Sequence, residues 1–277
     1  MRYRRIGSTR VSAIGLGTLG LTAEGGPDRP QAITTIRAAV ESGITLIDTA
    51  DAYGDGACEL LVAEALGSNA DDVLVATKGG IAYLPGGGWE HRGSPAQLRA
   101  AATDSARRLG VDAVGLFQFH HPDPAVPFDE SVGALLELLD EGVIRLAGVC
   151  NVTLEQMQTA HRILGRRLSS VQNRLSPRER GSEPQLDLTA DHDIAFLAWS
   201  PLGGARRAAS LGADNPEFAR VARELGVSVH RTTLAWELAM QHTVIPLVGA
   251  TRRTSIRDSA LAADLVLTSG QLDRLGA

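Results

Sequence analysis

The sequence predicts a single α/β domain over residues 1–277, a (β/α)8 barrel of the TIM type with a short N-terminal hairpin. Three observations predict this fold. Eight short apolar segments alternate with amphipathic segments of helical period, which is typical of parallel strands covered by helices. A chain of 277 residues has the length of one such barrel. No linker-like stretch rich in Pro, Ser or Gly divides the chain into smaller domains.

The elements follow one another in regular order. The first strand is expected at residues 12–18, and the first helix, 34–43, ends at a glycine suited to a helix C-terminus. Ser94 and Pro95 favour the start of a later helix, as N-cap and first helical residue. The remaining elements are strand 44–50, helix 57–67, strand 73–78, helix 94–110, strand 114–120, helix 129–142, strand 144–151, helix 153–164, strand 169–173, a short helix near 182–192, strand 194–200, helices 215–226 and 230–241, strand 243–249 and helix 255–263.

Residues 15–20, GLGTLG, match the glycine pattern of dinucleotide-binding Rossmann domains. That pattern requires a helix that opens on it and an acidic residue about 20 positions later. The next residues, LTAEGGPDRP, contain helix-breaking glycines and prolines, and Asp48 lies too far along the chain. We therefore interpret GLGTLG as the end of the first barrel strand and its loop. A doubly wound sheet is the less favoured alternative.

Composition excludes several classes of protein. The net charge is −5 and no basic run is present, which argues against nucleic acid or an anionic membrane as a partner. No apolar run reaches the roughly 20 residues of a membrane span. The charged start MRYRRIGS lacks the apolar segment of a signal peptide, and two cysteines make no disulfide framework. We expect a cytoplasmic protein.

Polar side chains end nearly every predicted strand, at the end of the barrel where reacting groups lie in this fold. Four ionisable residues stand out there: Asp48, Tyr53, Lys78 and His120. Each alone has an ordinary structural explanation, such as a helix N-cap for Asp48. Their convergence at one end of the barrel favours catalysis. No metal site is predicted.

The four residue types suggest proton transfer to a carbonyl oxygen. We expect the Lys78 ammonium to lower the pKa of the Tyr53 hydroxyl, and Asp48 to keep Lys78 charged. His120 is expected to hydrogen-bond the substrate carbonyl or to help deliver the proton. The outcome is a general acid beside a site for a developing oxyanion, which carbonyl reduction needs once a hydride donor is present.

Motifs along almost the whole chain resemble the aldo-keto reductase family. They are YRRIGSTRVSAIGLGT, LIDTADAYGDG, VLVATKGG, LGVDAVGLFQFHHPDP, EGVIRLAGVCN, VQNRLSP, AWSPLGG and VIPLVGATRR. The resemblance implies a barrel that binds NADPH, less often NADH, without a Rossmann fold. It places the family's catalytic tetrad on Asp48, Tyr53, Lys78 and His120. Of the two adjacent histidines, His120 is chosen because it ends the strand.

The same resemblance implies the residues that contact the cofactor. Asn151 and Gln172 would hold the nicotinamide carboxamide, and Trp199 stands where the family usually has a stacking tyrosine. Arg252 and Arg253 would grip a 2′-phosphate, which favours NADPH over NADH. The family's Arg or Gln and its Asn later in this loop fall on Ser255 and Ser259. The implied cofactor residues are Thr18, Asp48, Asn151, Gln172, Trp199, Ser200, Pro201, Leu202, Gly249, Thr251, Arg252, Arg253, Ser255 and Ser259.

The substrate is expected to be a small carbonyl compound or alcohol, contacted by Leu19, Tyr53, Trp89 and His120. Residues 79–95 form the longest irregular loop in this prediction, and their three consecutive glycines suggest a mobile flap. The alternative function is a cofactor-binding regulatory subunit like the potassium-channel β-subunits that share the family fold. A barrel isomerase or aldolase fits the four residues poorly. Reaction direction and oligomeric state stay open.

Overall fold

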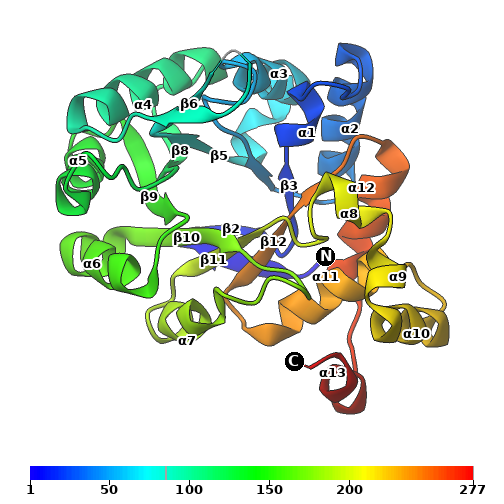
Figure 1. The fold of residues 1–277 in the computed structure, drawn as a ribbon. Coiled ribbons are helices and arrows are strands. Elements are labelled where there is room, and N and C mark those ends of the chain that lie inside the picture. The colour runs from blue at the N-terminus through cyan, green and yellow to red at the C-terminus, as the bar shows by residue number, and fades with distance from the viewer. Residues whose placement is uncertain (85, 277) are drawn as a thin grey trace.

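Eight parallel strands close into a barrel in the computed structural model, which describes residues 1–84 and 86–276 (Figure 1). Strand β12 pairs with β3 and so completes the ring. The predicted (β/α)8 barrel is confirmed. Its strands are β3 (Gly15–Gly17), β4 (Leu46–Asp48), β5 (Leu74–Gly79), β8 (Val114–Phe119), β9 (Ile144–Cys150), β10 (Leu168–Arg174), β11 (Ala195–Trp199) and β12 (Val244–Gly249).

Helices surround the strands as an outer layer, and the short C-terminal helix α13 (Ser269–Leu275) lies outside it (Figure 1). The longer helices are α2 (Arg29–Glu41), α3 (Ala57–Leu66), α4 (Pro95–Leu109), α5 (Phe128–Asp140), α6 (Leu154–Leu164), α7 (Glu183–Asp191), α10 (Pro216–Leu225), α11 (Val229–Met240) and α12 (Arg253–Ala260). Short turns of helix are α1 (Leu19–Thr22), α8 (Ala205–Ala208), α9 (Leu211–Asp214), η1 (Gly67–Asp72), η2 (Gly165–Arg167) and η3 (Leu261–Asp264).

Local sequence explains where two of these helices begin. The Ser94 hydroxyl accepts a hydrogen bond from the Gln97 N–H, and the Gln97 side chain returns one to the Ser94 backbone, as the predicted cap requires. Helix α2 begins earlier than predicted, at Arg29, because the Asp28 carboxylate caps it and Pro30 lies in the first turn. A proline is compatible with that turn, where its missing N–H would have no helical partner.

The predicted N-terminal hairpin is present as β1 (Tyr3–Ile6) and β2 (Thr9–Ser12). It covers the end of the barrel at which the strands start. Its turn residue Gly7 lies against Leu146 and Ser169, near the starts of β9 and β10. Ile6 and Val11 pack with side chains of the barrel interior. The opposite end, where the strands finish, therefore remains for the functional site.

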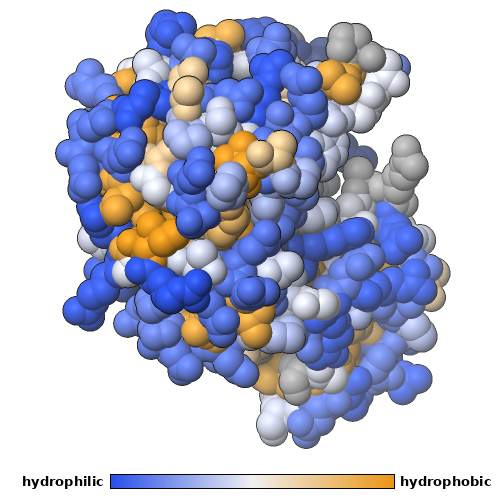
Figure 2. Space-filling model, turned by 60° about the vertical axis from the view of Figure 1, so that its left-hand side comes forward, coloured by the Kyte–Doolittle hydropathy of each residue, from blue (hydrophilic) through white to orange (hydrophobic). Residues whose placement is uncertain are grey.

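Apolar side chains fill the barrel and the layer between strands and helices. The interior cluster includes Leu46, Leu116, Leu197 and Ile245. Two larger clusters lie between the strands and the helices around them. The outer surface on the side of α4, α5 and α6 is mainly hydrophilic with scattered apolar patches (Figure 2). This distribution is that of a barrel with a packed core rather than a pore.

Two loop predictions need correction. Within the predicted irregular loop 79–95, β6 (Ile81–Tyr83) and β7 (Trp89–His91) pair as an antiparallel hairpin. Gly86, Gly87 and Gly88 all have positive φ in its turn, which glycine adopts without strain and which allows the strands to pair. A helix does open on GLGTLG, since α1 begins at Leu19 within the motif, but it ends after one turn at Thr22, before the glycines and prolines.

Candidate active site

The four predicted catalytic residues converge at the end of the barrel where the strands finish. Asp48 ends β4, Lys78 is the second-to-last residue of β5, and His120 directly follows β8. Tyr53 lies in the turn between β4 and α3. All four are buried, with exposed fractions of 4% for Asp48, 8% for Tyr53, 1% for Lys78 and 7% for His120.

Asp48 and Lys78 form a buried ion pair. Lys78 Nζ donates to Asp48 Oδ2 at 2.6 Å and to the Thr49 carbonyl oxygen at 2.8 Å. Asp48 Oδ1 accepts from Gln172 Nε2 at 2.8 Å and from Gln118 Nε2 at 3.4 Å. Burial alone would lower the pKa of Lys78, but the Asp48 carboxylate more than compensates and raises that pKa. The lysine therefore stays charged.

Tyr53 and His120 lie next to this pair. Their ring centroids are 5.9 Å apart, and Lys78 Nζ lies 5.2 Å from the centre of the Tyr53 ring. Burial raises the pKa of Tyr53, and the charge of Lys78 only opposes the rise. Lys78 therefore acts in the expected direction, but the pKa is raised overall because loss of solvation outweighs the nearby cation. Burial, followed by the charges of Lys78 and His121, holds the pKa of His120 well below its usual value.

Sequence reasoning missed two residues that support the tetrad. Glu59 of α3 accepts hydrogen bonds from Thr77 of β5 and Arg108 of α4, so it fixes the helix that follows the Tyr53 turn. Gln118 of β8 donates to Asp48, as described above. The signal in each case is a polar residue within an apolar segment, Glu59 in ACELL and Gln118 in LFQF.

The residues predicted to bind the nicotinamide lie beside the tetrad. Asn151 follows β9 with a φ of 57°, and its Nδ2 donates to the His120 carbonyl oxygen at 2.9 Å. Trp199 ends β11, and its Nε1 donates to Asn151 Oδ1 at 3.0 Å. Gln172 of β10 is joined to the tetrad through Asp48. These three side chains therefore share one polar network with the catalytic residues.

Thr18 and residues 200–202 flank this network. Thr18 follows β3, and its hydroxyl donates to the Asp48 carbonyl oxygen at 2.9 Å. Ser200 follows β11 with a φ of 53°, and the buried residues Pro201 and Leu202 continue the chain into the loop. Thr18 thus lies at the tetrad, and Ser200 lies next to Trp199.

The residues predicted for the adenosine end gather at the end of β12 and along α12. Thr251 lies against α1, since a Cβ added to Gly20 would come within 3.8 Å of its methyl group. Arg252 and Arg253 are exposed at the start of α12, whereas Ser259 is buried on the helix. The full set is Gly249, Thr251, Arg252, Arg253, Ser255 and Ser259.

The β6–β7 hairpin carries the predicted substrate residue Trp89 to the tetrad. The Trp89 ring lies 4.5 Å from that of His91 and 4.7 Å from that of His121. The His121 ring in turn lies 6.1 Å from that of His120. A row of rings therefore runs from His120 to the surface, where Trp89 is 37% exposed. Leu19, the other predicted wall residue, is exposed on α1.

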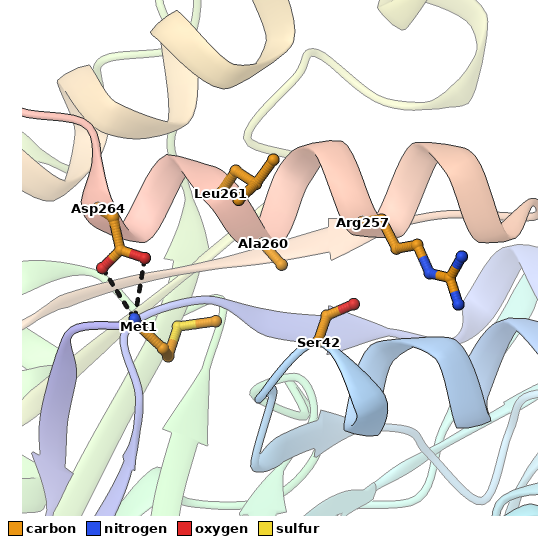
Figure 3. Close-up of a pocket in the computed structure, with 6 residues that line it drawn as sticks. All are labelled: Met1, Ser42, Arg257, Ala260, Leu261 and Asp264. Atoms are coloured by element: carbon orange, nitrogen blue, oxygen red, sulfur yellow. Dashed lines mark hydrogen bonds and ion pairs between the residues drawn. The ribbon is translucent and has the colours of Figure 1, made fainter.

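A further pocket lies away from these residues, beside the N-terminus (Figure 3). The Met1 amino group donates to the Asp264 carboxylate at 2.9 Å at its edge. None of the predicted site residues lines it. Its lining consists of Met1, Ser42, Arg257, Ala260, Leu261 and Asp264.

Residues 1–84 and 86–276 lack two further features, a cluster of metal-binding side chains and a membrane-spanning helix. No group of three or more His, Cys, Asp or Glu side chains is placed to hold a metal ion within these ranges. No helix in them has the length and apolar character needed to cross a membrane.

Known proteins identify the class of enzyme. The model described as "Aldo/keto reductase family" matches residues 13–277. The chain belongs to this family. It is 38% identical over 209 residues to the aldo-keto reductase YhdN of Bacillus subtilis, covering 73% of this chain and 62% of that protein. It is 29% identical over 280 residues to the pyridoxine 4-dehydrogenase of Escherichia coli, covering 98% of this chain and 96% of the relative.

Solved structures agree with the assignment. An aldo/keto reductase from Klebsiella pneumoniae, solved in complex with NADP and acetate, superimposes with a TM-score of 0.84 at 30% identity. The match covers 99% of this chain and 93% of that one. The resemblance inferred from the motifs is confirmed. This aldo-keto reductase is an NAD(P)H-dependent oxidoreductase.

Proposed function

We propose that this enzyme reduces the carbonyl group of an aldehyde, ketone or sugar-like compound, with Tyr53 as the general acid. In the reverse direction the same site would oxidise the alcohol. The observation that carries the proposal is the buried Asp48–Lys78 ion pair, with Nζ and Oδ2 2.6 Å apart, beside the Tyr53 and His120 rings. These groups match the needs of proton transfer to a carbonyl oxygen.

Each residue has a distinct role in this reaction. NADPH, when bound, supplies the hydride. Tyr53 keeps its proton until a strong base forms, because burial raises the pKa of its hydroxyl. Lys78 stabilises the negative charge that develops on the Tyr53 oxygen as the proton leaves, and Asp48 holds Lys78 in place. The neutral ring of His120 can donate one N–H to the substrate oxygen.

The residues present fit a nicotinamide cofactor. The side-chain amides of Asn151 and Gln172 supply the donor and acceptor groups that a carboxamide needs. Arg252 and Arg253 are exposed at the start of α12, where a helix N-terminus also favours an anion, and this supports NADPH over NADH. We assign the remaining contacts to Thr18, Asp48, Trp199, Ser200, Pro201, Leu202, Gly249, Thr251, Ser255 and Ser259.

The substrate would enter between the β6–β7 hairpin and α1. Trp89 and Leu19 are both partly exposed there. Trp89 is linked to the tetrad by the row of histidine rings, so a substrate that touches Trp89 lies on the path to His120. We propose that Trp89, Leu19, Tyr53 and His120 form the substrate contacts.

The test is a panel of aldehydes, ketones and sugars, with turnover followed by NADPH absorbance. Tyr53→Phe should lower turnover by about 10²- to 10⁴-fold, the usual contribution of a general acid, while NADPH binding persists. Tyr3→Phe is the matched control, because Tyr3 lies on the N-terminal hairpin at the other end of the barrel. Full activity in Tyr53→Phe would refute the assigned acid.

A further inference from the structure

Trp199 and Asn151 are joined by a hydrogen bond that crosses the end of a strand. Trp199 ends β11 and Asn151 follows β9, and β10 lies between these two strands in the barrel. The indole Nε1 donates to Asn151 Oδ1 at 3.0 Å. Asn151 Nδ2 then donates to the carbonyl oxygen of His120, which follows β8, at 2.9 Å. The three residues thus connect the ends of β8, β9 and β11, across the end of β10.

These two bonds determine which way the Asn151 amide faces. An indole N–H can only donate, and a backbone carbonyl can only accept. Rotating the amide by half a turn would place N–H against N–H and oxygen against oxygen. The backbone of Asn151 is fixed as well, because its N–H donates to the Gln172 carbonyl oxygen at 3.0 Å. The side-chain orientation is therefore set by its partners on both sides.

The groups that Asn151 has left match a primary carboxamide. An asparagine amide carries two N–H groups and an oxygen with two lone pairs. One N–H and one lone pair are used by His120 and Trp199, so one donor and one acceptor remain. A carboxamide such as that of nicotinamide can bind this pair with its own oxygen and N–H.

We propose that Trp199 is a positioning residue, whose indole N–H sets the Asn151 amide and thereby the orientation of the nicotinamide carboxamide. The inference rests on the proposed function, since it takes the ligand to be a nicotinamide cofactor. It assigns Trp199 a role beyond stacking, which a phenylalanine ring would not fulfil, because that ring carries no hydrogen-bond donor.

The indole is itself held in place by Arg174. The Arg174 guanidinium carbon lies 5.3 Å from the centre of the Trp199 ring. The two residues are register partners on β10 and β11. Arg174 also pairs with Glu179 at 3.5 Å, which limits the movement of the guanidinium. The attraction between this cation and the ring helps to hold the indole in the position in which its N–H points at Asn151.

Two matched substitutions of tryptophan by phenylalanine test the proposal. Trp199→Phe removes an N–H that has a partner, whereas Trp236→Phe removes a buried N–H that has none among residues 1–84 and 86–276. Trp236 packs against Phe218 outside the barrel. Binding of two ligands is measured by calorimetry: NADP⁺, and its 3-acetylpyridine analogue, whose acetyl group has no N–H.

The wild-type protein should bind NADP⁺ more tightly than the analogue. Trp199→Phe should weaken NADP⁺ binding roughly threefold to tenfold, the usual effect of losing one hydrogen bond, and change the analogue less. The dissociation constant of the analogue divided by that of NADP⁺ therefore falls. It should stay at the wild-type value in Trp236→Phe. Loss of stacking alone would weaken both ligands equally and leave the ratio unchanged.

A wild-type ratio in Trp199→Phe overturns the inference. Circular dichroism confirms that the variant is folded. If it is not, Trp199→Met replaces it, with the same expectation for the ratio, since methionine carries no hydrogen-bond donor. Failure of the wild-type protein to bind either ligand overturns the proposed function and the inference with it, so the two failures are distinguishable.

Discussion

Asp48 and Glu237 are two carboxyl groups that the fold buries to a similar extent and treats in opposite ways. Asp48 is 4% exposed and Glu237 is not exposed at all. The oxygens of Asp48 accept hydrogen bonds from Lys78, Gln172 and Gln118. Neither oxygen of Glu237 on α11 has a partner among residues 1–84 and 86–276. Burial raises the pKa of Glu237 well above its usual value.

The difference shows that the polar partners of a buried carboxyl group, and not burial alone, decide how the fold accommodates it. Parallel strands end side by side, so polar side chains at their ends come together and can solvate an anion. Glu237 lies on α11 between the buried residues Trp236 and Leu238, and burial raises its pKa with no nearby charge in the described part of the chain to oppose it. A carboxyl group in such surroundings keeps its proton.

The largest effect is expected on removing the cation beside Asp48. Lys78→Met leaves the Asp48 charge buried without its ion-pair partner, which typically costs about 3–5 kcal/mol of unfolding free energy. Turnover should fall by about 10²- to 10⁴-fold as well, because Tyr53 loses the charge that assists proton transfer. Urea unfolding and NADPH oxidation measure the two losses.

A double variant separates these effects. Asp48→Asn combined with Lys78→Met removes both charges, so most of the lost stability should return while turnover does not. Equal stability of the single and double variants would show that the ion pair is not what holds this region. In that case the burial of Asp48, like that of Glu237, would not depend on a charged partner.

Glu237 offers the next largest effect, on stability rather than activity. Glu237→Leu replaces an unpaired buried carboxyl by an apolar side chain and should raise the unfolding free energy by about 1–3 kcal/mol near neutral pH. NADPH oxidation should not change. The matched variant is Glu237→Gln, which keeps the shape and polarity but cannot ionise.

The pH dependence gives this prediction its sign. The folded state holds the Glu237 proton above the pH at which the unfolded chain releases it, because burial raises the pKa in the fold. Stability from this group is therefore full below the ordinary carboxyl pKa and is lost as pH rises, by up to about 1.4 kcal/mol per pH unit. Glu237→Gln should flatten that slope, and a slope equal to that of the wild type would contradict the assignment.

The sequence predicts that Asp48 and Lys78 come together, but it does not predict that Glu237 is buried. Asp48 and Lys78 end neighbouring strands, and period and strand order suffice to bring them together. Glu237 lies in a pattern, HRTTLAWELAMQ, that predicts a helix but not which turn is covered on every side. The depth of burial depends on packing by distant segments, and no local pattern reports it.

The same reason explains the other outcomes. The pKa of Tyr53 is raised rather than lowered because the burial of its hydroxyl depends on packing throughout the barrel. The early start of helix α2 at Arg29 has a local cause instead. Asp28 caps the helix, and Pro30 lies in its first turn, where a proline does not break it. The eight strands, which depend on short apolar runs, are predictable from sequence alone. Glu59 and Gln118 required knowledge of which side chains face the tetrad.

Asp51 lies between the two extremes and should give a smaller effect. Its Oδ1 has no partner in the described part of the chain, while its backbone N–H donates to the Lys78 carbonyl oxygen at 3.1 Å. Burial, with the charge of Glu59, raises the pKa of Asp51 to about 7. Stability from its proton is thus present at low pH and is lost as pH rises through about 7.

Asp51→Asn should remove this part of the pH dependence, which covers a narrower range than that of Glu237. Thermal unfolding from about pH 4 to about pH 7, between the ordinary pKa of an aspartate and the raised pKa of Asp51, measures it. The variant should lose less stability than the wild type across the window. If both lose the same amount, Asp51 does not change its protonation there.

The smallest effect is expected where a carboxylate has a partner but no burial. Glu141 pairs with Arg99 on the surface, with side chains 48% and 39% exposed, and the Arg99 hydrogen bond lowers the pKa of Glu141. Water solvates both ions almost as well as they solvate each other, and salt screens the pair. Glu141→Gln should therefore shift the midpoint of thermal unfolding only slightly at low salt and not at all at high salt. A shift as large as that of Lys78→Met, persisting in salt, would mean that pairing matters without burial, and the contrast between Asp48 and Glu237 would then need another explanation.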